Sequence, residues 1–208
     1  MKLIDLTLKE YLDVLKSDAP APGGGSVSAL AGAQGAALFT MVADLTIGKE
    51  KYVDFQDLCI EARKKGEVIF RELSDAVDKD TDAFNMIANA FKMPKETDDQ
   101  KHARKKAIAQ GTLIATQVPY SVMELAFEGL NMAKQMIGHS NPNAASDLGV
   151  GILNLMGCIK GAWLNVKINL PGVKDEVKAK AFKEGGQKIY DEAEAIAIKS
   201  YNEILKQL

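Results

Sequence analysis

One carboxylate interrupts an otherwise apolar helical pattern between residues 55 and 90. Positions spaced alternately four and three residues apart share one face of a helix. The face contains Asp80 and ten Phe, Cys, Ala, Gly, Ile or Leu residues, at positions 55, 59, 62, 66, 69, 73, 76, 83, 87 and 90. A carboxylate on a buried face either has a partner or stays partly protonated, because burial disfavours its charge. Asp80 is therefore a candidate general acid or base, and the alternative is a structural Asp80 that caps a helix break or pairs with a buried lysine.

Other acidic residues lie near Asp80 but off this apolar face. Asp75, Asp78 and Asp82 occupy other sides of the same helical pattern. We expect them on a solvated face, because charged residues cover the outer side of an amphipathic helix.

A loop rich in proline and glycine marks a second candidate site. Residues 19–25 read Ala-Pro-Ala-Pro-Gly-Gly-Gly, which forbids a continuous helix, and Ser26 is expected to be the N-cap of the helix that follows. Free N–H groups at a helix start favour an anion or a closely approaching ligand, and a mere tight connection is an equal alternative. No strand precedes the loop and no Gly-Lys-Ser/Thr follows it, which excludes a nucleotide-binding loop.

The elements that position these residues are predicted to be helices throughout. Ala, Leu, Lys and Glu dominate long segments, and hairpin dipeptides with alternating β-branched runs do not appear. We predict an all-α fold, a single domain over residues 1–208, built as a bundle of about six helices that includes long helices and small-residue-rich core helices. The expected spans are 5–18, 26–47, 52–91, 97–138 and 143–170, followed by an amphipathic last helix after residues 171–172.

Local signals set several of these boundaries. Thr97 and Gln100 have the spacing of a capping box, and Asn143 is a plausible N-cap for the fifth helix. Pro119 is expected to kink or divide the fourth helix.

Composition excludes several classes of protein. The chain has 208 residues, 26% of them charged, and a formal net charge of −2, so no global basic field favours nucleic acid or an acidic membrane surface. Two cysteines without metal-binding spacing, and His102 far from His139, predict no metal site and a reduced compartment. The amphipathic first 15 residues are unlike a signal peptide, so we expect a cytoplasmic protein.

Two apolar stretches approach the length of a membrane span. Residues 26–47 contain Gln34 and Asp44, and residues 148–170 contain Asn154, Lys160 and further polar residues. Polar groups are costly in lipid, so we interpret both stretches as buried core helices.

Four segments occur in a set order along the chain. They are residues 20–26 (Pro-Ala-Pro-Gly-Gly-Gly-Ser), residues 45–49 (Leu-Thr-Ile-Gly-Lys) with Tyr52, Asp80-x-x-Ala83-Phe84, and Asn141-x-Asn143-Ala144-x-Ser146-Asp147. Each segment alone is a weak signal, but four in order along a helical chain of this length are specific. Together they resemble the formiminotetrahydrofolate cyclodeaminase and methenyltetrahydrofolate cyclohydrolase family, over nearly the whole chain.

The resemblance implies a homodimeric enzyme that acts on the one-carbon unit of a tetrahydrofolate substrate, with no other cofactor. It makes Asp80 the proton-handling group and Lys49 a second catalytic candidate, which could stabilise Asp80 or bind a substrate carboxylate; such a lysine can also simply complement a helix dipole. Asp147 would pair with the amino-pyrimidine edge of the pterin. The implied substrate-binding residues are Pro22, Gly23, Gly24, Gly25, Ser26, Tyr52, Phe84, Asn143, Ser146 and Asp147.

Within this family the sequence favours the cyclohydrolase. We expect no attached formiminotransferase domain, and therefore hydrolysis of 5,10-methenyltetrahydrofolate to 10-formyltetrahydrofolate. The alternative is a formiminotetrahydrofolate cyclodeaminase that releases ammonia, since both reactions pass through a tetrahedral carbon between nitrogens. A non-catalytic helical dimer is the alternative outside enzymes.

Overall fold

The computed structural model describes residues 2–208, and within this range the chain forms α-helices and short 3-10 turns without a strand. The all-α prediction is confirmed. The α-helices are α1 (Leu8–Leu15), α2 (Gly24–Asp44), α3 (Gln56–Lys92), α4 (Asp98–Gln135), α5 (Ala145–Asn169) and α6 (Glu176–Leu205). The 3-10 turns are η1 (Leu3–Asp5), η2 (Glu50–Phe55), η3 (Pro142–Ala144) and η4 (Leu170–Gly172).

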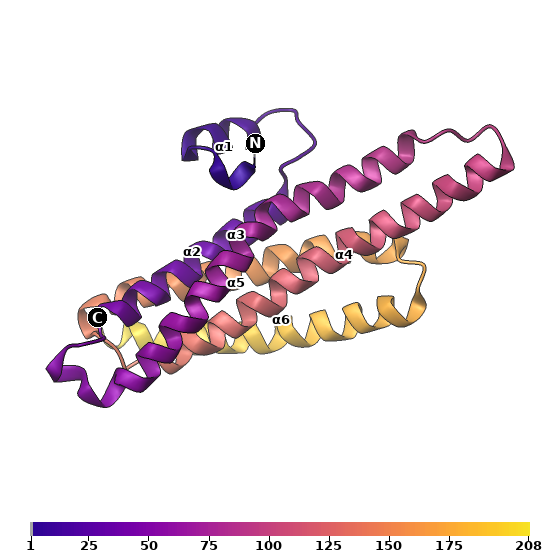
Figure 1. Ribbon diagram of the computed structural model, residues 1–208. Helices are drawn as coiled ribbons and strands as arrows, with labels where there is room; N and C mark the ends of the chain where they lie inside the picture. Colours follow the sequence, from indigo (N-terminus) through magenta and orange to yellow (C-terminus); the bar gives the residue numbers. More distant parts are fainter. Residues whose placement is uncertain (1) are drawn as a thin grey trace.

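Helix α2 packs between α3 and α5, and α4 also packs against α3 and α5 (Figure 1). Helix α6 covers α4 and α5, and the hairpin of α3 and α4 extends beyond the other helices. Helix α1 stands apart, over the start of α2, and a loop joins the two.

The small residues of α2 and α5 allow these two helices to touch closely. A Cβ atom on Gly35 would lie 2.7 Å from Leu155 Cγ and 2.8 Å from the Gly151 carbonyl oxygen, too close for any side chain. Ser28 lies against Gly161 in the same contact, so the two helices run antiparallel. The start of α2 therefore neighbours the end of α5, and the end of α2 neighbours the start of α5.

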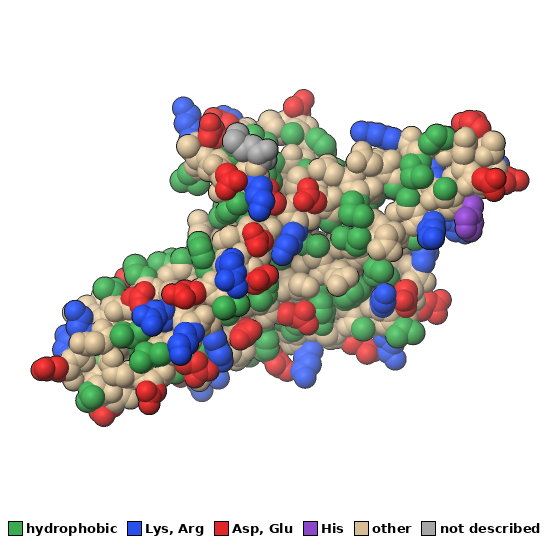
Figure 2. All heavy atoms as spheres, viewed as in Figure 1, with side chains coloured by type: hydrophobic (Ala, Val, Ile, Leu, Met, Phe, Trp, Pro, Cys, Tyr) green, Lys and Arg blue, Asp and Glu red, His purple; other side chains and the backbone are tan. Residues whose placement is uncertain are grey.

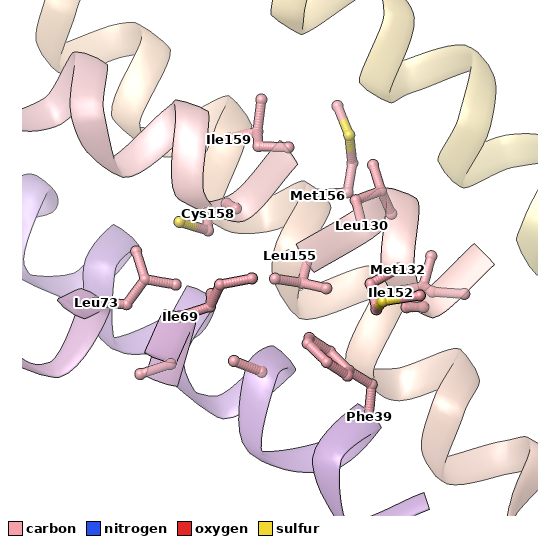
Figure 3. Packing of buried hydrophobic residues seen from close by; sticks show 14 of the residues in the cluster. Phe39, Ile69, Leu73, Leu130, Met132, Ile152, Leu155, Met156, Cys158 and Ile159 are labelled. Atoms are coloured by element: carbon pink, nitrogen blue, oxygen red, sulfur yellow. The ribbon is translucent and has the colours of Figure 1, made fainter. Parts of the chain in front are cut away.

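The core forms where α2, α3, α4 and α5 meet (Figure 3). Phe39, Leu73, Leu130, Ile152 and Leu155 are fully buried there, one or more from each of these helices. Burying such side chains stabilises a fold by about 1.5–3 kcal/mol each, so this cluster fixes how the helices align.

Several predicted boundaries hold, and others shift. The capping box is confirmed: Gln100 N–H donates to Thr97 Oγ1 over 3.2 Å, and Gln100 Oε1 accepts from Thr97 N–H. A second box, of Thr7 with Glu10, starts α1 at Leu8, so the predicted span of 5–18 was too long. Pro119 lies inside α4 without dividing it.

The two predicted N-caps at Ser26 and Asn143 are wrong. Helix α2 begins at Gly24 with Gly23 as its N-cap, because the Ser26 side chain turns toward α3 instead of back to its own helix. Helix α5 begins at Ala145, and Asn141 provides the side-chain cap of the preceding η3 by accepting from Asn143 N–H over 3.1 Å.

Candidate active site

The carboxyl group of Asp80 on α3 contacts the first turn of α2. Its Oδ2 accepts a hydrogen bond from Ser26 N–H over 3.0 Å. A Cβ atom on Gly25 would overlap the Asp80 carboxyl group, so the backbone of α2 approaches this carboxylate as only glycine allows. The anion that the helix start was expected to attract is thus a side chain of the same protein.

The hydroxyl of Ser26 forms its main hydrogen bond with a group other than Asp80. It donates to the Val77 carbonyl oxygen over 2.7 Å, and it lies 3.2 Å from Thr81 Oγ1. A serine hydroxyl has one proton, so its longer contact of 3.5 Å to Asp80 Oδ2 is weaker than the backbone bond. Ser26 N–H is therefore the principal protein donor to Asp80 within residues 2–208.

No lysine or arginine among the described residues lies within 4.0 Å of the Asp80 carboxylate. The alternative in which Asp80 pairs with a buried lysine is therefore wrong. Burial raises the pKa of Asp80 above that of an ordinary aspartate, and the hydrogen bonds from Ser26 oppose that rise only in part. A partly buried carboxyl without a cation, close to solvent, is suited to accept and return a proton.

Four further residues that the resemblance implicates lie near this carboxylate or in its loop. Pro22 is buried just before α2, Gly23 and Gly24 start the helix, and Phe84 lies one turn after Asp80 with an exposed ring. The first group of predicted site residues thus lies together at the start of α2.

The other predicted residues gather at the far end of α2. Tyr52 O–H in η2 donates to Asn141 Oδ1 over 2.9 Å, and Asn141 N–H donates to Thr46 Oγ1 over 2.9 Å. Asn141 Nδ2 also donates to the Leu45 carbonyl oxygen over 3.3 Å. These bonds fasten the loop before α5 to the turn after α2, and place the start of α5 beside it.

This second group includes Lys49, Tyr52, Asn143, Ser146 and Asp147, where Lys49, Asn143 and Ser146 are exposed and Asp147 is half-buried in the first turn of α5. The sequence analysis did not predict a site role for Asn141, yet its hydrogen bonds to Tyr52, Thr46 and Leu45 organise this end. Its position between Gly138 and Pro142 was the sequence feature that could have indicated this structural role.

The two groups lie at opposite ends of α2 (Figure 1). The helix has 21 residues, and at 1.5 Å per residue it is about 30 Å long. Within one chain Lys49 therefore does not reach Asp80. Spacing along the chain did not reveal this, because it does not show how helices fold back on one another.

Asp78 also differs from its expected role on a solvated face. Its Oδ1 accepts from Leu3 N–H over 2.6 Å and its Oδ2 from Ile4 N–H over 3.3 Å. It thereby fastens η1 to α3 one half-turn from Asp80. Among residues 2–208, no group of three or more His, Cys, Asp or Glu side chains has the arrangement of a metal site.

Comparison with known proteins identifies the class of this helical protein. Residues 7–188 match the formiminotransferase-cyclodeaminase family, and the chain belongs to that family. The predicted resemblance is confirmed.

Two kinds of relative share the family. A methenyltetrahydrofolate cyclohydrolase of Methylorubrum extorquens is 38% identical over 173 residues, which cover 83% of each chain. A formimidoyltransferase-cyclodeaminase of Gallus gallus is 32% identical over 174 residues, or 84% of this chain, and this chain spans about a third of its length.

The same fold occurs in a solved structure. The crystal structure of formiminotetrahydrofolate cyclodeaminase from Thermotoga maritima matches with a TM-score of 0.81 and 26% identity, covering 100% of this chain and 98% of that one. The predicted bundle architecture agrees with this match over its whole length.

Proposed function

We propose that this protein is a methenyltetrahydrofolate cyclohydrolase in which Asp80 carries the proton. The observation that supports this most strongly is the Asp80 carboxyl itself, which is partly buried, has a raised pKa and forms no ion pair within residues 2–208. The cyclohydrolase of Methylorubrum extorquens supports the substrate, because it matches over most of both chains.

The chemistry requires one group that first accepts a proton and then returns it. Ionised Asp80 takes a proton from water as the water oxygen bonds to the electrophilic methenyl carbon. Protonated Asp80 then gives that proton to ring nitrogen N5 as its bond to the carbon breaks. The remaining hydroxyl becomes the formyl carbonyl and its proton leaves to solvent, which yields 10-formyltetrahydrofolate.

The cyclodeaminase reaction is the alternative, and the names of the other relatives favour it. There Asp80 would take a proton from N10 as it attacks the formimino carbon, and would protonate the departing ammonia. Both reactions use the same carboxyl and a tetrahedral carbon, so Asp80 serves either one.

The homodimer is part of the proposal, and the outer face of α2 and α5 supports it. Both helices are long and apolar enough to cross a membrane, and 56% of the apolar stretch in each is buried inside the fold. Large apolar side chains remain exposed on the two helices, which is the mark of an interface. We call this set the α2–α5 face: Val27, Met41, Leu45, Val150, Leu153, Leu164 and Ile168.

A second copy of the chain fits this face better than other occupants, because the face connects the two groups of site residues. In a two-fold dimer the same patch meets itself. If α2 of one subunit runs antiparallel to α2 of its partner, Asp80 of one subunit lies near Lys49, Tyr52 and Asp147 of the other. The proposed site is then composite and occurs twice in the dimer.

The small volume of the cavity near this end of α2 also supports a site that is built from two subunits. The cavity under α1, which is lined by Leu30 and Val77 one turn from Ser26 and Asp80, has a volume of about 170 Å³. Sites for ligands of folate size are typically 300–1,000 Å³. A subunit contact that covers Phe84 and the start of α2 would supply additional walls.

A cytoplasmic location without nucleic-acid or membrane partners completes the proposal. The free buried cysteines Cys59 and Cys158 are compatible with a reducing compartment. Acidic and basic side chains are interspersed over the face in Figure 2, instead of forming one large basic area.

The test follows the near-ultraviolet absorbance of the methenyl group. Purified wild type and Asp80→Asn are mixed with 5,10-methenyltetrahydrofolate and, separately, with 5-formiminotetrahydrofolate. Accelerated loss from the first substrate, absent in Asp80→Asn, supports the cyclohydrolase, and accelerated gain from the second supports the deaminase. If neither substrate reacts faster, the non-catalytic helical dimer replaces both proposals.

A further inference from the structure

A cavity at the outer end of the α3–α4 hairpin is lined by basic side chains. No aspartate or glutamate within residues 2–208 lines it, and its volume is about 420 Å³. The cations come from three segments, namely the loop after α3, the first turns of α4 and the loop before α6. We call this cavity the basic pocket, and its five cations are Lys95, Lys101, Arg104, Lys105 and Lys174.

Most of these cations have no acidic partner. Lys101 pairs with Asp98 at 2.9 Å, and the other four form no ion pair within residues 2–208. Basic residues on one helix face would simply be solvated, but here three segments fold together and bring like charges to one cavity. A concave site lined by charge of one sign attracts a ligand of the opposite sign, so the basic pocket favours an anion.

The side chain of Arg104 is held in position for such an anion. Its Nε and Nη2 donate to the Phe91 carbonyl oxygen at the end of α3, over 3.4 and 3.3 Å. The guanidinium carbon lies 5.6 Å from the centre of the Phe91 ring. A guanidinium group has five N–H donors, so those not used for Phe91 remain for a ligand. Their planar arrangement suits a carboxylate.

A strip of apolar side chains connects the basic pocket with Asp80. Four residues spaced four, three and four positions apart share one face of α3: Asp80, Phe84, Ile87 and Phe91. The Phe84 and Phe91 side chains are 39% and 57% exposed. At 1.5 Å per residue, the contact of Arg104 with Phe91 lies about 16 Å from Asp80 along the helix.

The proposed substrate carries its chemical groups in the same order. A tetrahydrofolate has its one-carbon unit next to an aminobenzoyl ring, and the ring carries a glutamate that can be extended through its γ-carboxyl. With the one-carbon unit at Asp80, the aromatic ring packs on Phe84, about 6 Å further along α3. About 10 Å remain from Phe84 to Phe91, and an extended residue spans about 3.5 Å, so about two or three glutamates reach Arg104.

We propose that the basic pocket binds the carboxylates of a γ-linked oligoglutamate tail on the folate substrate, beyond its first glutamate. Arg104 binds one carboxylate with its remaining N–H groups, and the lysines bind the next ones. The pocket anchors the substrate and takes no part in the chemistry. The inference rests on the proposed folate activity at Asp80, and adds that tail length determines affinity.

The test compares 5,10-methenyltetrahydrofolate with one and with three glutamates. We measure kcat and KM for wild type and for Lys105→Gln/Lys174→Gln, which removes two charges from the pocket. Neither lysine forms an ion pair within the described residues, so the substitutions break no such contact. Lys199→Gln/Lys206→Gln is the matched control, because it removes the same charge at least about 35 Å along α6 from its first residue.

In wild type the triglutamate should have a KM about tenfold lower than the monoglutamate at equal kcat, since contacts remote from the reacting carbon change KM alone. In Lys105→Gln/Lys174→Gln this advantage should fall below about threefold, with monoglutamate kinetics unchanged. The control should keep the wild-type advantage. Equal KM for both tails in wild type, an unchanged advantage in the pocket variant, or an equal loss in the control overturns the inference.

A binding measurement separates this inference from the proposed hydrolysis. Calorimetry with tetrahydrofolate mono- and triglutamate requires no turnover. Tighter triglutamate binding that Lys105→Gln/Lys174→Gln loses supports the basic pocket, whether or not the methenyl ring is hydrolysed. Turnover that is independent of tail length rejects the pocket and leaves the hydrolysis standing. Absence of both turnover and folate binding in wild type rejects both.

Discussion

The amide of Ser26 and the carboxylate of Asp80 are 54 residues apart in sequence and 3.0 Å apart in the fold. This bond joins the first turn of α2 to the middle of α3. It fixes the position of Asp80 Oδ2 and leaves Oδ1 available to exchange a proton. The positive end of the α2 dipole favours the ionised form, and burial favours the neutral form. The balance keeps both protonation states accessible.

Asp80→Asn should abolish turnover and raise stability at neutral pH. The folded-state pKa of Asp80 is raised, so its contribution to stability is fully present below the unfolded-state pKa and is lost as pH rises through the folded-state pKa. The melting temperature of Asp80→Asn should therefore exceed that of wild type at pH 7, and the difference should shrink in acid. Thermal unfolding across pH measures this; a less stable variant at pH 7 would contradict the assigned direction.

Gly25→Ala should disable the site while leaving the bundle folded. The added Cβ would overlap the Asp80 carboxyl, so either α2 or the Asp80 side chain must shift. A displacement of about 1 Å can reduce turnover about 100-fold. We expect a large fall in kcat with helical circular dichroism retained. Wild-type kcat would mean that the Ser26–Asp80 contact is not needed for turnover.

Mixing two inactive variants tests whether the site is composite. Asp80→Asn removes a residue from one end of α2, and Asp147→Asn removes one from the other end. If each site uses both subunits, a mixed dimer has one intact site and one doubly altered site. Refolding the variants together in equal amounts should restore about a quarter of wild-type activity, since about half of the dimers are mixed. Activity that does not rise above the separate variants would place each site within a single chain.

Leu153→Glu should prevent dimerisation through the α2–α5 face. Leu153 is 49% exposed on α5, and a buried unpaired carboxylate at its position would oppose association. Val177→Glu is the matched control, because Val177 is 80% exposed on α6 and lies off this face. Light scattering should report a monomer for Leu153→Glu and a dimer for Val177→Glu. A dimeric Leu153→Glu would mean that the subunits associate through another surface.

Local patterns were sufficient for the helices and for Asp80. The three-and-four spacing predicted α3 and identified the one carboxylate on its apolar face, and Thr97 with Gln100 marked the start of α4 correctly. These features depend on residues within one or two turns of each other, so periodicity and capping rules describe them well. The four ordered segments likewise identified the family.

Tertiary structure alone decided which of these residues meet. The hydrogen bond from Ser26 to Asp80 and the separation of Lys49 from Asp80 both depend on how α2 and α3 pack. Those contacts depend on helix length, turn geometry and the close approach allowed at Gly25. Residues distant in sequence become neighbours through the shape of the whole core, which local spacing does not encode.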